Sequence, residues 1–67
     1  MQAYSPYDIA TELVEHLVQR VVFVAPTHCI FETSTKLKAD KAAELLHDFS
    51  AHVVTKNNQF FISVPLH

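Results

Sequence analysis

Five histidines and one cysteine are the side chains of this 67-residue chain best suited to metal binding or nucleophilic chemistry. The histidines are His16, His28, His47, His52 and His67. Their spacing matches neither HxxxH nor HExxH, and Cys29 has no CxxC partner. His28 and Cys29 are neighbours in an expected strand, so their side chains point to opposite faces and cannot chelate one ion. We expect surface histidines and no metal or cofactor, with a site shared between subunits as the open alternative.

Catalysis by Cys29 or by paired carboxylates has little support in the sequence. Cys29 lies among apolar residues, where a thiol is usually small packing material. Two acidic pairs recur 32 positions apart, namely Asp8 with Asp40 and Glu12 with Glu44. They are expected on solvated helix faces, where acidic side chains also favour helix starts. The interpretation therefore favours a non-enzymatic protein, and an enzyme whose site is assembled between subunits stays open as the alternative.

The chain contains no glycine, and this excludes several classes of site together. Phosphate-cradling loops need glycines so that the backbone can approach the anion. A serine nucleophile elbow needs them for its strained turn. Dinucleotide sites, P-loops and elbow-type hydrolases are all disfavoured.

A small basic cluster supports the alternative function of a nucleic-acid-binding regulator. Lys36, Lys38 and Lys41 lie at the start of the second expected helix. Exposed aromatic residues of a sheet, such as Phe31 or Phe61, could stack on bases beside them. The net charge of −2 argues against this function.

An internal similarity organises the chain that carries these residues. Residues 8–32, shifted by 32 positions, align without a gap on residues 40–64, with seven identities in 25 positions. The identities pair Asp8, Ala10, Glu12, Leu13, Val21, Val22 and Ile30 with their counterparts. The alignment predicts a tandem α-β-β repeat within one domain of residues 1–67, with units at 5–34 and 35–67.

Each unit has the pattern of one amphipathic helix and two strands. Ser5, Pro6 and Asp8 are typical of a helix start, and apolar residues at helical spacing continue from Ile9. Ser34 and Thr35 can cap a second helix, expected over about residues 38–50. The strands are expected over 21–25, 28–33, 52–56 and 59–66, with Asn57-Asn58 as a two-residue hairpin turn. The prediction is an α+β fold, a four-stranded antiparallel sheet with two helices on one face.

The alternation in the last strand assigns the faces of the sheet. Phe60, Ile62, Val64 and Leu66 share the side expected to meet the helices, and Phe61 takes the other. Carrying this register through the repeat places Ile30 inside. It places Cys29 and Phe31 outside with Phe61. The resulting hypothesis is an apolar interface on the far side of the sheet, formed by Val21, Phe23, Cys29, Phe31 and Phe61.

Length and composition favour association. A chain this short gains only about 3–5 kcal/mol from its own core, and one cysteine cannot form an intrachain disulfide. The single cysteine and the lack of a signal-peptide pattern indicate a cytoplasmic protein, and no apolar run is long enough for a membrane span. We expect a homodimeric interaction module that binds a protein or small ligand at or near its apolar sheet face.

Overall fold

The computed structural model describes residues 5–66, and their elements follow the order α-β-β-α-β-β. The helices are α1 (Pro6–Val14) and α2 (Lys36–Leu45), and a short 3-10 helix, η1 (His47–Phe49), follows α2. The strands are β1 (Arg20–Val24), β2 (His28–Thr33), β3 (His52–Lys56) and β4 (Gln59–Pro65). The element order is compatible with the predicted repeat.

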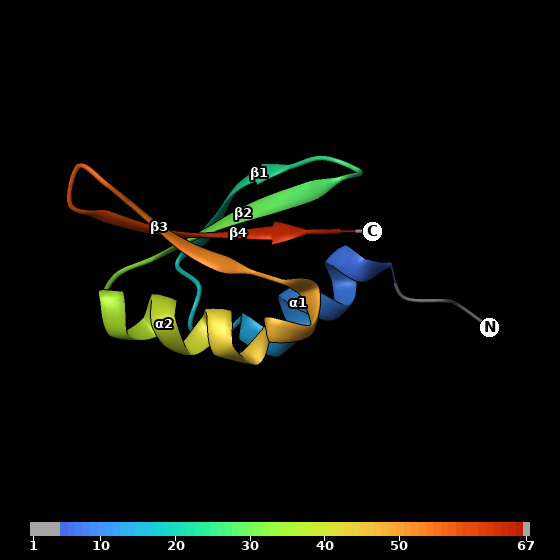
Figure 1. The fold of residues 1–67 in the computed structure, drawn as a ribbon, viewed down its shortest axis with the longest axis horizontal. Coiled ribbons are helices and arrows are strands. Elements are labelled where there is room, and N and C mark those ends of the chain that lie inside the picture. Colours follow the sequence, from blue (N-terminus) through green and yellow to red (C-terminus); the bar gives the residue numbers. More distant parts are fainter. Residues whose placement is uncertain (1–4, 67) are drawn as a thin grey trace.

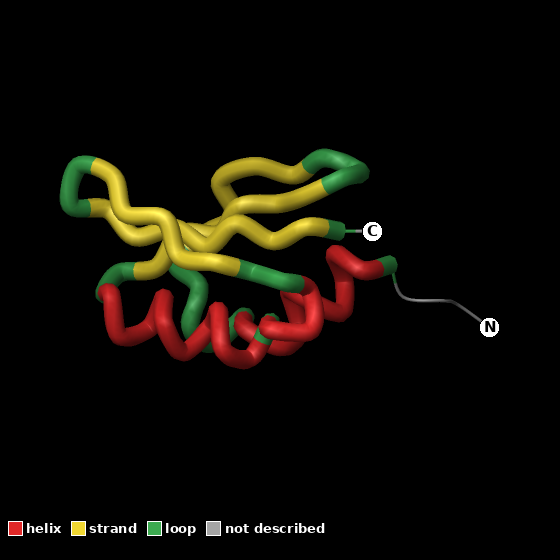
Figure 2. The backbone as a smooth tube through the Cα atoms, viewed as in Figure 1, coloured by secondary structure: helices red, strands yellow, loops and turns green. Residues whose placement is uncertain are grey.

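The four strands form one antiparallel sheet in the order β1-β2-β4-β3, so the two hairpins lie side by side with β2 and β4 in the centre. Both helices lie on one face of this sheet, and the opposite face is open (Figures 1 and 2). The predicted α+β fold with a four-stranded antiparallel sheet is confirmed. We call the face that meets the helices the inner face, and the opposite one the outer face.

The helix starts follow the sequence signals. The hydroxyl of Ser5 accepts a hydrogen bond from the backbone N–H of Asp8, and the Asp8 carboxylate accepts one from the backbone N–H of Ser5. This reciprocal capping box, with Pro6 at the first helical position, satisfies N–H groups that the helix cannot pair. At α2 the cap is a single bond, in which the hydroxyl of Thr35 accepts from the backbone N–H of Lys38.

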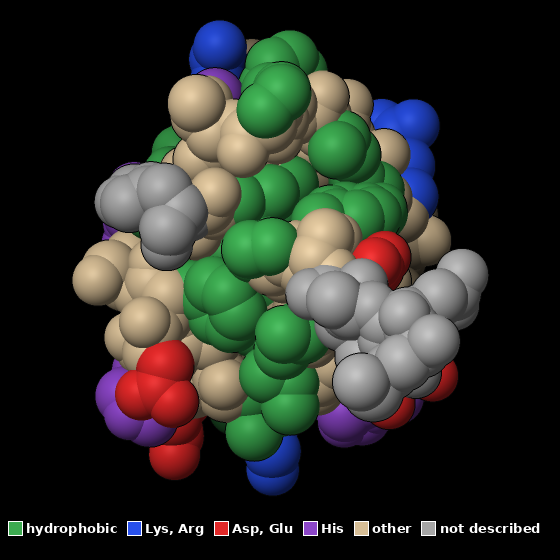
Figure 3. Space-filling view, turned by 90° about the vertical axis from the view of Figure 1, so that its right-hand side faces the viewer, with side chains coloured by type: hydrophobic (Ala, Val, Ile, Leu, Met, Phe, Trp, Pro, Cys, Tyr) green, Lys and Arg blue, Asp and Glu red, His purple; other side chains and the backbone are tan. Residues whose placement is uncertain are grey.

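The core lies between the helices and the inner face of the sheet. Small residues on the helices, Ala10 on α1 and Ala39 and Ala42 on α2, are fully buried. Because their side chains are short, the helices can pack close to the strands. Viewed from the end where the termini lie, hydrophobic side chains form a nearly continuous band from the helical layer to the sheet (Figure 3).

The faces assigned from the sequence to Cys29, Ile30 and Phe31 are wrong. Cys29 and Phe31 lie on the inner face, with 0% and 1% of their surface exposed, and the ring of Phe31 stacks on that of Tyr7 at 6.4 Å. Their cross-strand partners are Val64 and Ile62, which are also buried. Ile30 therefore points to the outer face, the reverse of the expectation.

A β-bulge in β1 explains the error. The register pairs Val21 with Phe31 but Phe23 with Ile30, so that Val22 is an extra residue. The β3–β4 hairpin has no such shift and pairs Val53 with Ile62. The first hairpin thus has one residue more than the second, and a one-residue slip reverses the face of every side chain. The ungapped alignment holds through Val21 and is off by one along β2.

The second hairpin turns as expected. Asn57 and Asn58 adopt φ values of 52° and 64°, the left-handed region that a two-residue hairpin turn requires. Asparagine tolerates this region because its short polar side chain can bond locally.

Candidate functional site

The outer face of the sheet has an apolar surface formed by all four strands. Cross-strand partners share a face, so the register brings Phe23 beside Ile30, and Phe61 beside Val54. We call the five hydrophobic side chains on this face the apolar centre: Val22, Phe23, Ile30, Val54 and Phe61. Each is partly or largely exposed, because the helices cover only the inner face.

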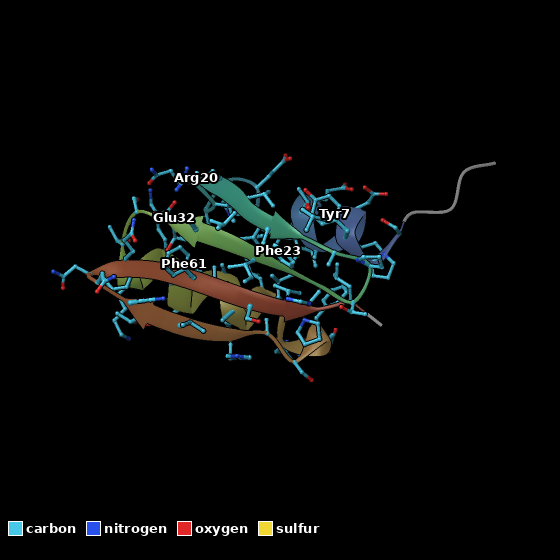
Figure 4. The ribbon with its side chains drawn as sticks, turned by 90° about the horizontal axis from the view of Figure 1, so that it is seen from above. Tyr7, Arg20, Phe23, Glu32 and Phe61 are labelled. Carbon is cyan, nitrogen blue, oxygen red and sulfur yellow. The ribbon has the colours of Figure 1, made fainter. Side chains whose placement is uncertain are left out.

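The apolar centre contains a shallow hollow of about 300 Å³. Its apolar walls are Val22, Ile30, Val54 and Phe61. Its polar lining comes from His52, Lys56 and Ser63. Figure 4 looks onto this face and shows Phe61 on the central strand β4 and Phe23 toward the β1 side.

An ion pair borders the apolar centre at one end. The Nε of Arg20 lies 2.6 Å from Oε1 of Glu32, its direct partner across β1 and β2 (Figure 4). The side-chain amide of Gln59 donates to the other oxygen, Oε2, at 3.4 Å. The Glu32 side chain is only 9% exposed, so both donors compensate a carboxylate that has lost most of its water.

The outer face of the sheet carries a net positive charge. Among the residues of β1–β4 whose register places them on this face, Glu32 is the sole carboxylate, and Arg20 neutralises it. Within the described chain, Lys56 forms no ion pair, so its charge remains uncompensated. His52 lies two residues before Val54 on the same face, and His28 is placed there by its pairing with Pro65.

The five residues of the sequence-based interface hypothesis separate in the structure. Phe23 and Phe61 belong to the apolar centre. Val21 pairs with Phe31 and therefore has inner-face register, although its position on the edge strand leaves it 37% exposed. Cys29 and Phe31 are core residues and are not available to a partner.

Three members of the apolar centre were missed by the sequence interpretation: Val22, Ile30 and Val54. Ile30 was assigned to the wrong face through the repeat. The signal for Val54 was its pairing with Phe61, which becomes readable once the two-residue turn at Asn57-Asn58 fixes the hairpin register. The outward position of Val22 results from the bulge, and no residue type in β1 predicts a bulge there.

The lysine cluster and the sheet aromatics do not share a surface. Lys36, Lys38 and Lys41 are exposed on α2, in the helical layer, and Lys36 pairs with Asp40 at 2.9 Å. Phe61 lies on the opposite side of the molecule and Phe31 is buried. The predicted nucleic-acid surface therefore has its basic and aromatic halves on different faces.

Cys29 has the environment of a packing residue. Burial raises the pKa of its thiol from 9.0 to about 11, so the nucleophilic thiolate is scarce near neutral pH. His28, its neighbour, lies on the outer face with its ring 5.1 Å from that of Phe23. The base and the nucleophile are thus on opposite sides of the sheet.

The remaining candidates are dispersed. Within residues 5–66, no three histidine, cysteine or acidic side chains are grouped as metal ligands, and His67 lies outside these residues. Asp8 belongs to the capping box of α1, Asp40 pairs with Lys36, and Glu12 and Glu44 are exposed on separate helices.

Neither helix of the described part has the length and hydrophobicity that a membrane-spanning segment requires. Comparison with protein-family models, with curated proteins and with solved structures gives no match.

Proposed function

We propose that this protein is a small non-enzymatic interaction module that forms a homodimer and binds a ligand on the outer face of its sheet. The observation that carries the proposal is the apolar centre: a hollowed hydrophobic surface with a polar border, left open by both helices. An apolar middle and a polar rim are typical of binding surfaces. A reducing compartment such as the cytoplasm suits its single thiol.

The β1 edge supports association with a second copy. Four consecutive residues of this strand, Val21–Val24, are large and hydrophobic, and each is between 37% and 52% exposed. The opposite edge strand, β3, instead ends in Thr55 and Lys56 and begins with His52. Polar and charged residues protect an edge from pairing, and β1 lacks them beyond Arg20.

A second copy of the chain fits this edge better than an unrelated partner. A twofold dimer brings the same patch of each subunit together, so a uniformly apolar strand is complementary to itself. Burial of Val21 and Val24, which have inner-face register, would also add to a core that is small for an independent domain. Association at the edge leaves the outer face open to a ligand.

The test of the dimer is the solution mass by light scattering over a dilution series. We expect a dimer for the native chain and a monomer for Val24→Lys. This substitution places a charge on the β1 edge at Val24, the most exposed of the four residues Val21–Val24. Thr55→Lys, on the exposed edge strand β3, is the matched control and should remain dimeric. A native chain that is monomeric throughout, or a dimer that survives Val24→Lys with unchanged mass, contradicts this arrangement.

A further inference from the structure

The hollow of the outer face combines apolar walls with one uncompensated cation, and this combination specifies a class of ligand. We propose that the hollow binds a small organic monocarboxylate with an aliphatic or aromatic body, its carboxylate held at Lys56. The inference rests on the proposed role of the outer face as a binding surface, and it does not depend on the dimer.

The size and the walls of the hollow determine the body of the ligand. Its volume of about 300 Å³ lies at the lower end of the range for small-molecule sites. The walls formed by Val22, Ile30, Val54 and Phe61 offer no hydrogen bond from their side chains, so only an apolar group gains by displacing water from them. A short acyl chain or a single aromatic ring meets both conditions.

The polar lining determines the headgroup. Lys56 and His52 lie on the same face of β3, and Ser63 is the direct partner of His52 on β4. An ammonium, an imidazole N–H and a hydroxyl can all donate to a carboxylate. His52 and Ser63 lie at one end of the hollow, and Lys56 is four residues further along β3, about 13 Å away. One carboxylate cannot contact both ends, and the charged ammonium of Lys56 is the stronger partner for it.

The other charged side chains of the outer face disfavour a cationic ligand. Glu32, the one carboxylate among the outward positions of the four strands, already accepts hydrogen bonds from Arg20 and Gln59. A cationic ligand would therefore find no unpaired carboxylate on this face and would be repelled by Lys56. An anion gains one charge partner without separating an existing pair.

The experiment is an NMR titration of the ¹⁵N-labelled protein with three ligands of equal length: octanoate, 1-octanol and octylammonium. Octanoate and octylammonium are kept below their micellar concentrations, and 1-octanol is kept below its solubility limit. We expect octanoate to shift the amide signals of the hollow and to bind about tenfold more tightly than 1-octanol. Octylammonium should bind more weakly than either. Shortening octanoate to hexanoate should weaken binding by up to about fourfold per methylene.

Matched variants locate the headgroup and the body. Lys56→Gln should reduce octanoate binding to the level of 1-octanol, while Lys41→Gln, on α2, should leave it unchanged. Phe61→Ser should weaken both ligands. Val54→Thr, which keeps the volume of the side chain, serves as a second wall variant if circular dichroism shows that Phe61→Ser is unfolded.

The outcomes separate the two proposals. Equal affinity of the native protein for octanoate and 1-octanol, or an octanoate affinity that Lys56→Gln leaves unchanged, overturns the monocarboxylate inference while the outer face remains a binding surface. The absence of shifts in the hollow with both ligands overturns the inference and also the small-ligand role of this face.

Discussion

The hairpins β1–β2 and β3–β4 occupy equivalent places in the sheet, yet they differ by a single residue. The second hairpin is regular and closes through the tight turn at Asn57-Asn58. The first has a bulge at Val22, which places two successive side chains, Val22 and Phe23, opposite Ile30. One added residue therefore decides which side chains of β2 enter the core.

The same difference shapes the surface. Because of the bulge, Val21 has inner-face register while Val22 and Phe23 both lie on the outer face. Val22 lines the hollow there. On β3 the corresponding alternation places only Val54 there, between His52 and Lys56. The β1–β2 hairpin thus supplies three of the five side chains of the apolar centre, and the β3–β4 hairpin supplies the cation, Lys56.

The strongest test of the face assignment compares Phe31 with Phe61. We expect Phe31→Ala to lose about 3–5 kcal/mol in the free energy of unfolding, because it empties a fully buried site beside Tyr7. Such a loss equals the stability expected of so small a core, so Phe31→Leu is needed as a milder variant.

Phe61→Ala, on the outer face, should cost about 1 kcal/mol. Urea unfolding followed by circular dichroism measures all three variants. Equal losses for Phe31→Ala and Phe61→Ala are incompatible with the two faces described for these rings.

The bulge itself can be tested by deletion. Removing Val22 preserves the pairs Val21–Phe31 and Phe23–Ile30, so we expect a loss within about 1 kcal/mol. Removing Val54 from the regular hairpin shifts Val53 outward and brings His52 to an inner position. That change should cost about 3 kcal/mol, since it removes the partly buried Val53 from the edge of the core and brings an imidazole to its place.

Denaturant titrations of the two deletion variants decide this prediction, and the native chain provides the reference. If the two deletions lower the free energy of unfolding equally, Val22 is not an extra residue of the hairpin and the account of the bulge is wrong.

The inner position of Cys29 predicts a pH dependence of stability. The thiol has a pKa of about 11 in the folded chain against an ordinary value of 9.0, so its neutral form favours folding. The contribution is complete below about pH 9 and is lost as the pH rises toward 11, where unfolded chains ionise first. We expect the native chain to lose about 2 kcal/mol more than Cys29→Ala across this interval.

Thermal or denaturant unfolding of both proteins between pH 8 and 11 measures the difference. Lysines and tyrosines titrate in the same range in both proteins, and the comparison with Cys29→Ala removes their effect. Parallel curves would place the thiol in contact with solvent.

Much of the architecture could be predicted from the sequence because its signals are local. Ser5, Pro6 and Asp8 form a helix start through bonds within three residues, and Asn57-Asn58 form a turn because of their own backbone preferences. The alternation along β4 correctly placed Phe61 outside and Ile62 inside, since a strand buried on one face repeats every two residues. These features, with the element order, determine the α+β class.

The face of β2 could not be obtained in this way. HCIFET contains hydrophobic residues at successive positions, so either register offers apolar side chains to the core. The choice depends on how β2 pairs with β1 and β4, and a bulge changes this pairing by one residue without a recognisable residue type. The second helix was also expected to reach residue 50, whereas α2 ends at Leu45 and a 3-10 helix follows it. The apolar pattern continues because Phe49 still packs on the core.

The sequence by itself determined which elements form, in what order, and with which residues at their ends, because capping, turn formation and periodicity act over a few neighbouring positions. Only the tertiary structure decided that Phe31 is core and Ile30 is surface, and that Lys56 and Phe61 line one hollow while the lysines of α2 lie on the other side of the molecule. The physical reason is that strand register and layer packing arise from contacts between distant segments, where one extra residue reverses a face.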